Sequence, residues 1–135
     1  MTERRIVQRF KDWKEPDFDE RGVTKWNWMC QYHENLRLGK NTDIGAFTYI
    51  NAKYSVAIEE EVQIGSHCSI YSESTIDGKK GRVVIRRNAK IGAHSVIMPG
   101  ITIGKGAIVA ACSFVNKDVP EDAMFGGVPA KALKV

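Results

Sequence analysis

The chain has 135 residues, of which 43% are hydrophobic, so it can bury a core but is too short for a catalytic domain plus a separate substrate domain. Its 20 basic and 16 acidic side chains leave a formal charge of +4, an excess too small to indicate nucleic-acid binding by itself. No apolar run reaches the roughly 20 residues of a membrane span, and the amino terminus leads into no signal-peptide core. The three cysteines lack Cys-x-x-Cys spacing and suit neither a disulfide scaffold nor a zinc knuckle. We therefore expect a reduced, cytoplasmic protein.

The first 37 residues lie outside any repeat and contain all three tryptophans, Trp13, Trp26 and Trp28. Pro16 and Gly22 interrupt any long helix here. The end of a stack of strands exposes unpaired backbone and an open core. We therefore expect residues 1–37 to cap the domain that follows; a part in binding a substrate is the alternative.

An aliphatic residue returns every six positions from Leu38 onward, with phase slips of two residues before Ile58 and three before Ile85. The series is Leu38, Ile44, Ile50, Ile58, Ile64, Ile70, Ile76, Ile85, Ile91, Ile97, Ile103, Val109 and Val115. A six-residue unit is one short strand plus a turn and cannot bury its aliphatic residue alone. The period predicts an all-β solenoid over residues 38–120, with three units to a triangular coil and roughly four coils.

Two other repeat positions are regular. The residue after the aliphatic one is often glycine, as at Gly39, Gly45, Gly65, Gly92 and Gly104. We expect these glycines to supply unusual φ angles at the corners. The residue four positions after the aliphatic one is mostly small and should point into the narrow core. Cys68 and Cys112 are assigned to this inward set, as buried space-filling residues rather than nucleophiles or metal ligands.

The segment 77–84 interrupts the repeat. It is polar, basic and flanked by glycine, and it includes Lys79 and Lys80. Such a segment is expected to protrude from a solenoid. The last stretch, residues 121–135, contains Gly126-Gly127-Val128-Pro129-Ala130-Lys131 and is expected to close the other end.

The stretch 91–104, Ile-Gly-Ala-His-Ser-Val-Ile-Met-Pro-Gly-Ile-Thr-Ile-Gly, resembles the hexapeptide-repeat acyltransferases, especially the maltose, galactoside and lipopolysaccharide-type sugar O-acetyltransferases. The resemblance covers about residues 38–133 and implies a left-handed parallel β-helix; general crossover rules would favour the right-handed form. It also implies a homotrimer with acetyl-CoA bound between subunits, a sugar-like acceptor and a role in polysaccharide biosynthesis. In relatives a loop placed like 77–84 borders a neighbouring subunit's acceptor site, so Lys79 and Lys80 are candidates for substrate contact.

Acetyl transfer from a thioester needs a base that takes the acceptor's proton, and imidazole, with an ordinary pKa of roughly 6.5, suits this role. His94 lies on an outward position of its hexad and matches the family's catalytic histidine, including the Pro99-Gly100 that follows. Without that match, His94 would be interpreted as an exposed turn residue. His67 holds the same place in its own hexad but lacks the Pro-Gly; we assign it to substrate contact or, alternatively, to an exposed turn.

The stretch 107–118 resembles the family's coenzyme A cradle, in which small residues let the pantetheine lie against the backbone. The resemblance assigns coenzyme A binding to Gly104, Ala110, Ala111, Ser113, Asn116, Lys117 and Lys131. The two lysines match positions where basic side chains meet the coenzyme phosphates. As isolated residues they are equally well explained as solvated surface charges.

Two alternatives stay open. Lys90 occurs where many relatives have Trp or Tyr, and Met98 replaces a frequent Asn or Leu, which leaves room for an inactive trimeric scaffold. A zinc enzyme like the γ-type carbonic anhydrases needs three nitrogen ligands, but the position five residues after His94 is Pro99, so no metal is expected. Coenzyme A binding separates the enzyme from the scaffold.

Overall fold

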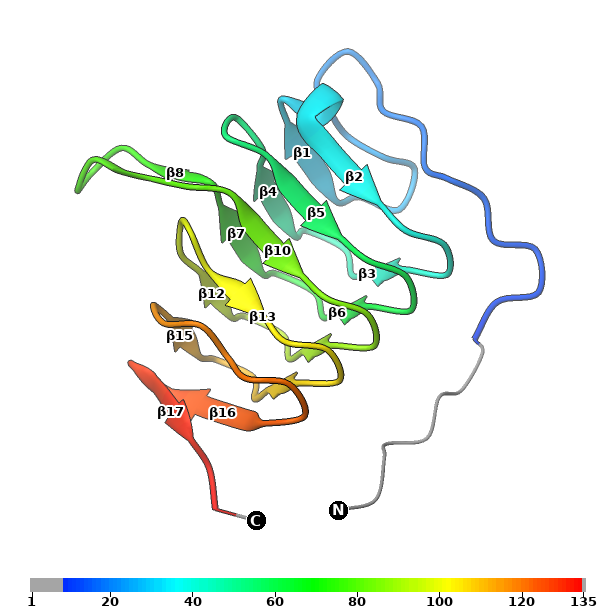
Figure 1. Ribbon diagram of the computed structural model, residues 1–135. Helices are drawn as coiled ribbons and strands as arrows, with labels where there is room; N and C mark the ends of the chain where they lie inside the picture. The colour runs from blue at the N-terminus through cyan, green and yellow to red at the C-terminus, as the bar shows by residue number, and fades with distance from the viewer. Residues whose placement is uncertain (1–8, 135) are drawn as a thin grey trace.

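The structure is a computed structural model that describes residues 9–134, and it is almost entirely β (Figure 1). Three sheets form the walls of a triangular prism. Sheet A contains β1 (Met29–Gln31), β4 (Tyr49–Asn51), β7 (Ser69–Tyr71), β12 (Val96–Ile97) and β15 (Phe114–Val115). Sheet B contains β2 (Leu36–Leu38), β5 (Val56–Ile58), β10 (Val83–Ile85) and β13 (Thr102–Ile103). Sheet C contains β3 (Asp43–Ile44), β6 (Gln63–Ile64), β11 (Lys90–Ile91), β14 (Ile108–Val109), β16 (Met124–Gly127) and β17 (Ala130–Ala132).

Each coil runs from sheet B to sheet C to sheet A, and successive coils pair in parallel at equivalent repeat positions. Ile50 pairs with Ile70, and Ile64 pairs with Ile91, so the aliphatic side chains stack inside the prism. Twelve of the thirteen predicted aliphatic positions lie in these strands and make four coils of three. Together with β1 and β16 the stack has about five turns. The predicted parallel solenoid is confirmed.

Ile76 is the exception, and its assignment to the repeat is wrong. It is 100% exposed near the tip of an antiparallel hairpin formed by β8 (Glu73–Ser74) and β9 (Lys79–Lys80). The hairpin projects from the edge between sheets A and B (Figure 1), so no neighbouring coil covers the side chain. Its spacing of six residues from Ile70 therefore does not reflect packing.

The role predicted for the repeat glycines is also wrong. None of the five has a positive φ. A Cβ on Gly45 or Gly92 would instead lie 2.4 Å from a backbone nitrogen of the next coil. Glycine is required here because the coils approach closely, while the left-handed turn conformation falls on the residue three positions after the aliphatic one, as at Asn41 and Asn88.

The amino-terminal segment covers the first coil and a strip of sheet C. Trp28 is buried against the core, and the ring of Phe18 packs edge-on against it at 5.4 Å. The Trp13 Nε1 donates a hydrogen bond to the carbonyl oxygen of Thr42 at 2.9 Å. Nearer the amino terminus, Arg9 pairs with Asp43 on the outer face of sheet C. Residues 9–28 thus lie against the first coil and sheet C, and the solenoid already begins at β1, ahead of residue 38. A single 3-10 turn, η1 (His33–Asn35), separates β1 from β2.

The carboxyl-terminal tail closes the opposite end. β16 continues sheet C by pairing in parallel with β14, and β17 folds back antiparallel on β16. Across residues 9–134, no helix has the length and apolar character needed to cross a bilayer.

Candidate active site

The edge between sheets C and A carries a column of four side chains, which we call the histidine edge: Phe47, His67, His94 and Cys112. Each occupies the left-handed turn position of its coil, with φ between 56° and 65°. The backbone is tied from coil to coil, because His94 N donates to Ser66 O at 3.0 Å and Cys112 N donates to Ala93 O at 2.9 Å. The turn geometry therefore projects these side chains outward, one above another.

The two imidazoles on this edge are stacked. The rings of His67 and His94 lie 4.7 Å apart between centroids, with an interplanar angle of 3°. Phe47 adds a tilted ring at 5.2 Å on the far side of His67. All three residues are exposed. An exposed His94 imidazole is thus held by a flat neighbour on one face and remains open to a substrate from other directions.

Beside the histidine edge, sheet C presents a shallow groove of about 390 Å³. Its floor contains Gly45, Gly65 and Gly92, which lack side chains because the adjacent coil leaves no space for them. Lys90, the departure from the family pattern noted above, is exposed and lines the same groove. The close coil packing therefore leaves bare backbone next to His94, a surface on which an extended chain can lie.

Two predicted cradle residues adjoin this edge. Ala111 is exposed one residue before Cys112, and its N–H donates to no residue within the described part of the chain. Ala110 is half-buried, and its carbonyl oxygen accepts hydrogen bonds from Ser95 Oγ at 3.1 Å and Ser113 Oγ at 2.6 Å. The free amide of Ala111 is available to a ligand, whereas the carbonyl of Ala110 is engaged.

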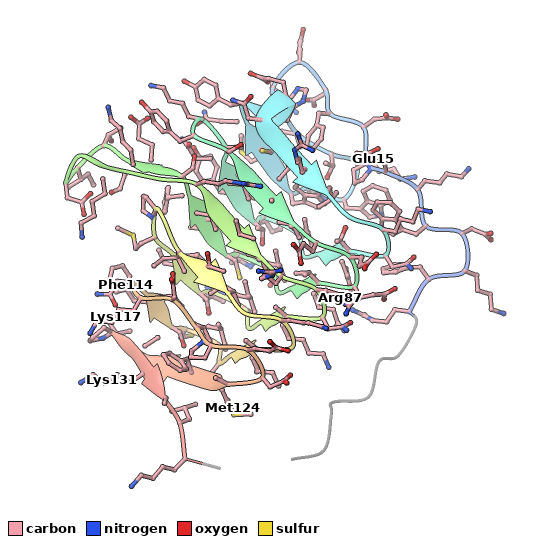
Figure 2. All side chains as sticks on the ribbon, in the orientation of Figure 1. Glu15, Arg87, Phe114, Lys117, Met124 and Lys131 are labelled. Atoms are coloured by element: carbon pink, nitrogen blue, oxygen red, sulfur yellow. The ribbon has the colours of Figure 1, made fainter. Side chains whose placement is uncertain are left out.

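The other predicted cradle residues are dispersed. Ser113 is buried, and its hydroxyl accepts from Gly127 N at 3.2 Å, so it ties the tail to the last coil. Gly104 lies at the edge between sheets B and C, away from the histidine edge. Asn116, Lys117 and Lys131 are exposed, and Figure 2 shows both lysines on the side of the molecule that carries Phe114.

The cysteines differ from one another. Cys68 is buried as predicted; its Sγ lies 3.3 Å from the Gly92 carbonyl, and burial raises the pKa of its thiol. Burial likewise raises the pKa of Cys30 to about 12. The assignment of Cys112 to the buried set is wrong, because it lies three positions after Val109, at the turn, and is exposed on the histidine edge. In that turn it is Ser113, four positions after Val109, that is buried.

Lys79 and Lys80 lie on the hairpin at the edge between sheets A and B. Lys79 lies 3.8 Å from Asp77, and Lys80 lies over the ring of Tyr54 at 5.4 Å. Within one chain the fold does not bring them to His94. Nor do residues 9–134 contain a group of three His, Cys, Asp or Glu side chains positioned to hold a metal.

Phe47 and Cys112 were missed as site residues by the sequence analysis. The signal that finds them is their hexad position, three residues after Ile44 and Val109, which is the position that His67 and His94 share. Register between coils then places all four on one edge.

Comparison with known proteins supports the fold. The family model described as bacterial transferase hexapeptide (six repeats) matches residues 82–117. Galactoside O-acetyltransferase of Escherichia coli (strain K12) is 31% identical over 111 residues, which cover 71% of this chain and 55% of that protein. A hexapeptide-repeat acetyltransferase of Vibrio cholerae, solved with acetyl coenzyme A, is 32% identical with a TM-score of 0.75 and covers 79% of this chain and 63% of that one. A galactoside acetyltransferase solved with coenzyme A is 26% identical with a TM-score of 0.71, over 79% and 57% of the two chains.

The parallel coils, the period of six and these similarities define a left-handed parallel β-helix. The chain contains the bacterial transferase hexapeptide repeat and is similar over most of its length to hexapeptide-repeat acetyltransferases. It spans between 51% and 64% of the length of the first three curated relatives that it matches.

Proposed function

We propose that this chain is a coenzyme A-dependent acetyltransferase that acetylates a hydroxyl or amine of a sugar-like acceptor. The observation that carries the proposal is the exposed His94 imidazole on a left-handed corner, beside a groove of bare glycine backbone. The similarity to a galactoside O-acetyltransferase and to acetyltransferases solved with acetyl-CoA or coenzyme A supports both the donor and the acceptor class.

In this mechanism His94 takes the proton of the acceptor hydroxyl as its oxygen attacks the thioester carbonyl carbon. The carbon–oxygen bond forms, the carbon–sulfur bond breaks, and the proton passes from His94 to the departing coenzyme A sulfur. The N–H of Ala111, which has no partner in the described residues, binds the pantetheine, and Lys117 and Lys131 hold the phosphates. Asn116 contributes a polar contact near them.

We further propose a homotrimer with sheet A facing the threefold axis. Its outer face carries the rings of Tyr49 and Tyr71, 5.7 Å apart, and Phe114 farther along, with the polar residues Gln31, Asn51 and Ser69 among them. The histidine edge and the hairpin edge are the two margins of this sheet, so such a trimer sets the hairpin of one subunit, with Lys79 and Lys80, beside His94 of the next. The three cysteines are free, which suits the reducing cytoplasm where polysaccharide precursors would be acetylated.

Coenzyme A binding tests the donor site. Light scattering should first give a mass three times the 15.1 kDa of the chain, and calorimetric titration of that protein should then give a roughly micromolar Kd for acetyl-CoA. Ala111→Phe should weaken it at least about tenfold, because the ring covers the backbone beside Cys112. Lys40→Phe is the control and should keep the wild-type Kd, since Lys40 is exposed at the same hexad position on the edge between sheets B and C. A folded protein that binds nothing at millimolar ligand would leave the inactive scaffold as the better account.

His67 provides a second test of the same site. We expect His67→Ala to lower kcat by about tenfold, since His94 then loses the flat surface that restricts its ring. His67→Phe keeps that surface but removes the ring nitrogens, and should recover most of the rate. If instead both variants raise KM for the acceptor equally and leave kcat unchanged, His67 contacts the substrate through its nitrogens rather than positioning His94.

A further inference from the structure

A second concave surface lies on the outer face of sheet B, which is the wall opposite the histidine edge. The groove has a volume of about 620 Å³, within the range of roughly 300–1,000 Å³ typical of ligand sites. The acetyl-transfer mechanism uses none of its side chains. We call it the sheet B groove.

Small residues make its floor. Arg37 on β2 stands in register with Ala57 on β5, and Gly39 follows one residue beyond the end of β2. Because neither Ala57 nor Gly39 carries a long side chain, the space beside Arg37 is left open. The groove therefore follows from a local change of residue size on an otherwise charged face.

Its rim is basic. Two acidic residues, Glu59 and Glu60, face five basic residues, which leaves a surplus of three positive charges. The basic residues are Arg37, Arg82, Arg86, Arg87 and Lys105.

Part of this positive charge is not paired with the protein's own carboxylates. Arg86 lies 3.7 Å from Glu59, and Arg87 lies 3.5 Å from Glu60. Arg37 and Arg82, by contrast, have no carboxylate within ion-pair distance in residues 9–134. Arg87, seen beyond the end of β10 in Figure 2, also has a buried Nε without a hydrogen-bond partner. The groove thus offers guanidinium donors that the protein itself does not satisfy.

We propose that the sheet B groove binds an acidic saccharide. The planar guanidinium groups of Arg37 and Arg82 match carboxylate oxygens and donate paired hydrogen bonds to them. Glu59 Oε1 already accepts from Arg87 N at 3.0 Å, but its other oxygen and the carboxylate of Glu60 can accept hydrogen bonds from saccharide hydroxyls, which a purely basic groove would not. That this saccharide belongs to the acceptor chain rests on the acetyltransferase function proposed above; the binding itself does not.

The composition of the groove favours a saccharide over a nucleic acid. No aromatic residue lines it, so bases would find no surface on which to stack. Glu59 and Glu60 lie among the cations and would repel closely spaced phosphates, whereas isolated carboxylates on a glycan can avoid them. The ligand that fits this groove therefore carries a few separated negative charges surrounded by hydroxyls.

The test uses partly methyl-esterified α-linked oligogalacturonate, which carries isolated carboxylates among hydroxyls, with its fully methyl-esterified form as the matched neutral ligand. Both are titrated calorimetrically into the full-length protein without acetyl-CoA, so the outcome does not depend on catalysis. We expect the acid to bind, the ester to bind at least about tenfold more weakly, and the affinity for the acid to fall as salt is raised from 50 to 300 mM.

Charge-removing variants locate the binding. Arg37→Gln/Arg82→Gln should weaken oligogalacturonate binding about tenfold or more while the Kd for acetyl-CoA stays unchanged. Lys11→Gln/Lys25→Gln removes the same charge outside the groove and should change neither affinity. The proposal would be overturned if acid and ester bound equally, or if both double variants lost the same affinity for the acid. It would also be overturned if a single-stranded oligonucleotide bound more tightly than the acid. If the wild-type protein does not bind acetyl-CoA, that result would count against the acetyltransferase function alone.

Discussion

Replacing His94 with alanine is expected to lower kcat for acetyl transfer by about 10²–10⁴-fold, the usual contribution of a general base. The imidazole is exposed on the histidine edge, and it is the ring that accepts the acceptor's proton in the proposed mechanism. The Kd for acetyl-CoA should change less than about twofold, because the backbone beside Ala111 is untouched. Product coenzyme A should be quantified by chromatography, since a thiol reagent would also react with the exposed Cys112.

His33→Ala is the matched control for this substitution. His33 is also exposed, but it stacks on Phe18 at 4.5 Å near the capped end of the solenoid. Its removal should leave kcat within about twofold of the wild-type value. A His94→Ala rate within a few-fold of wild type would rule out His94 as the base and would direct attention to the other groups on the histidine edge.

The period of six predicted the solenoid because each aliphatic side chain must find the same partner in the next coil. The pairing of Ile64 with Ile91 meets that requirement across the hairpin insertion. The same rule failed at Ile76, where the chain leaves the stack and no partner exists. Periodicity reports packing only where coils are contiguous, so an insertion that happens to contain an isoleucine at the sixth position is misread.

The candidate site was predictable in part. The resemblance identified His94 and Ala111, and the structure brings both to one edge of the prism. The stacking of His67 on His94 was not predictable from spacing, because the hairpin makes the intervening coil longer and the register between coils is fixed only by strand pairing. Cys112 was misplaced by one hexad position, which in a turn is the difference between a buried and an exposed side chain.

Gly104 separates two explanations of a repeat glycine. The family pattern assigns it to coenzyme A binding, whereas the structure places it at the edge between sheets B and C. There a Cβ would lie 2.4 Å from Glu121 N and 2.6 Å from Pro120 C. Backbone atoms cannot yield as a flexible side chain does, so an added methyl group must force the tail away from the last complete coil.

We therefore expect Gly104→Ala to lower the free energy of unfolding by about 2–4 kcal/mol and the Tm by roughly 5–15 °C, measured by circular dichroism. Gly78→Asn is the control: its Cβ meets nothing within 4 Å, and asparagine tolerates the positive φ of 70° at that position. Its Tm should stay within about 2 °C of wild type. A Gly104→Ala protein with unchanged Tm but a weakened Kd for acetyl-CoA would show the opposite, that this glycine serves the ligand and the coil junction yields. If the glycine serves packing, the Kd for acetyl-CoA, measured at a temperature well below the lowered Tm, should equal that of the wild type. The reason is that the histidine edge keeps its own coil-to-coil hydrogen bonds.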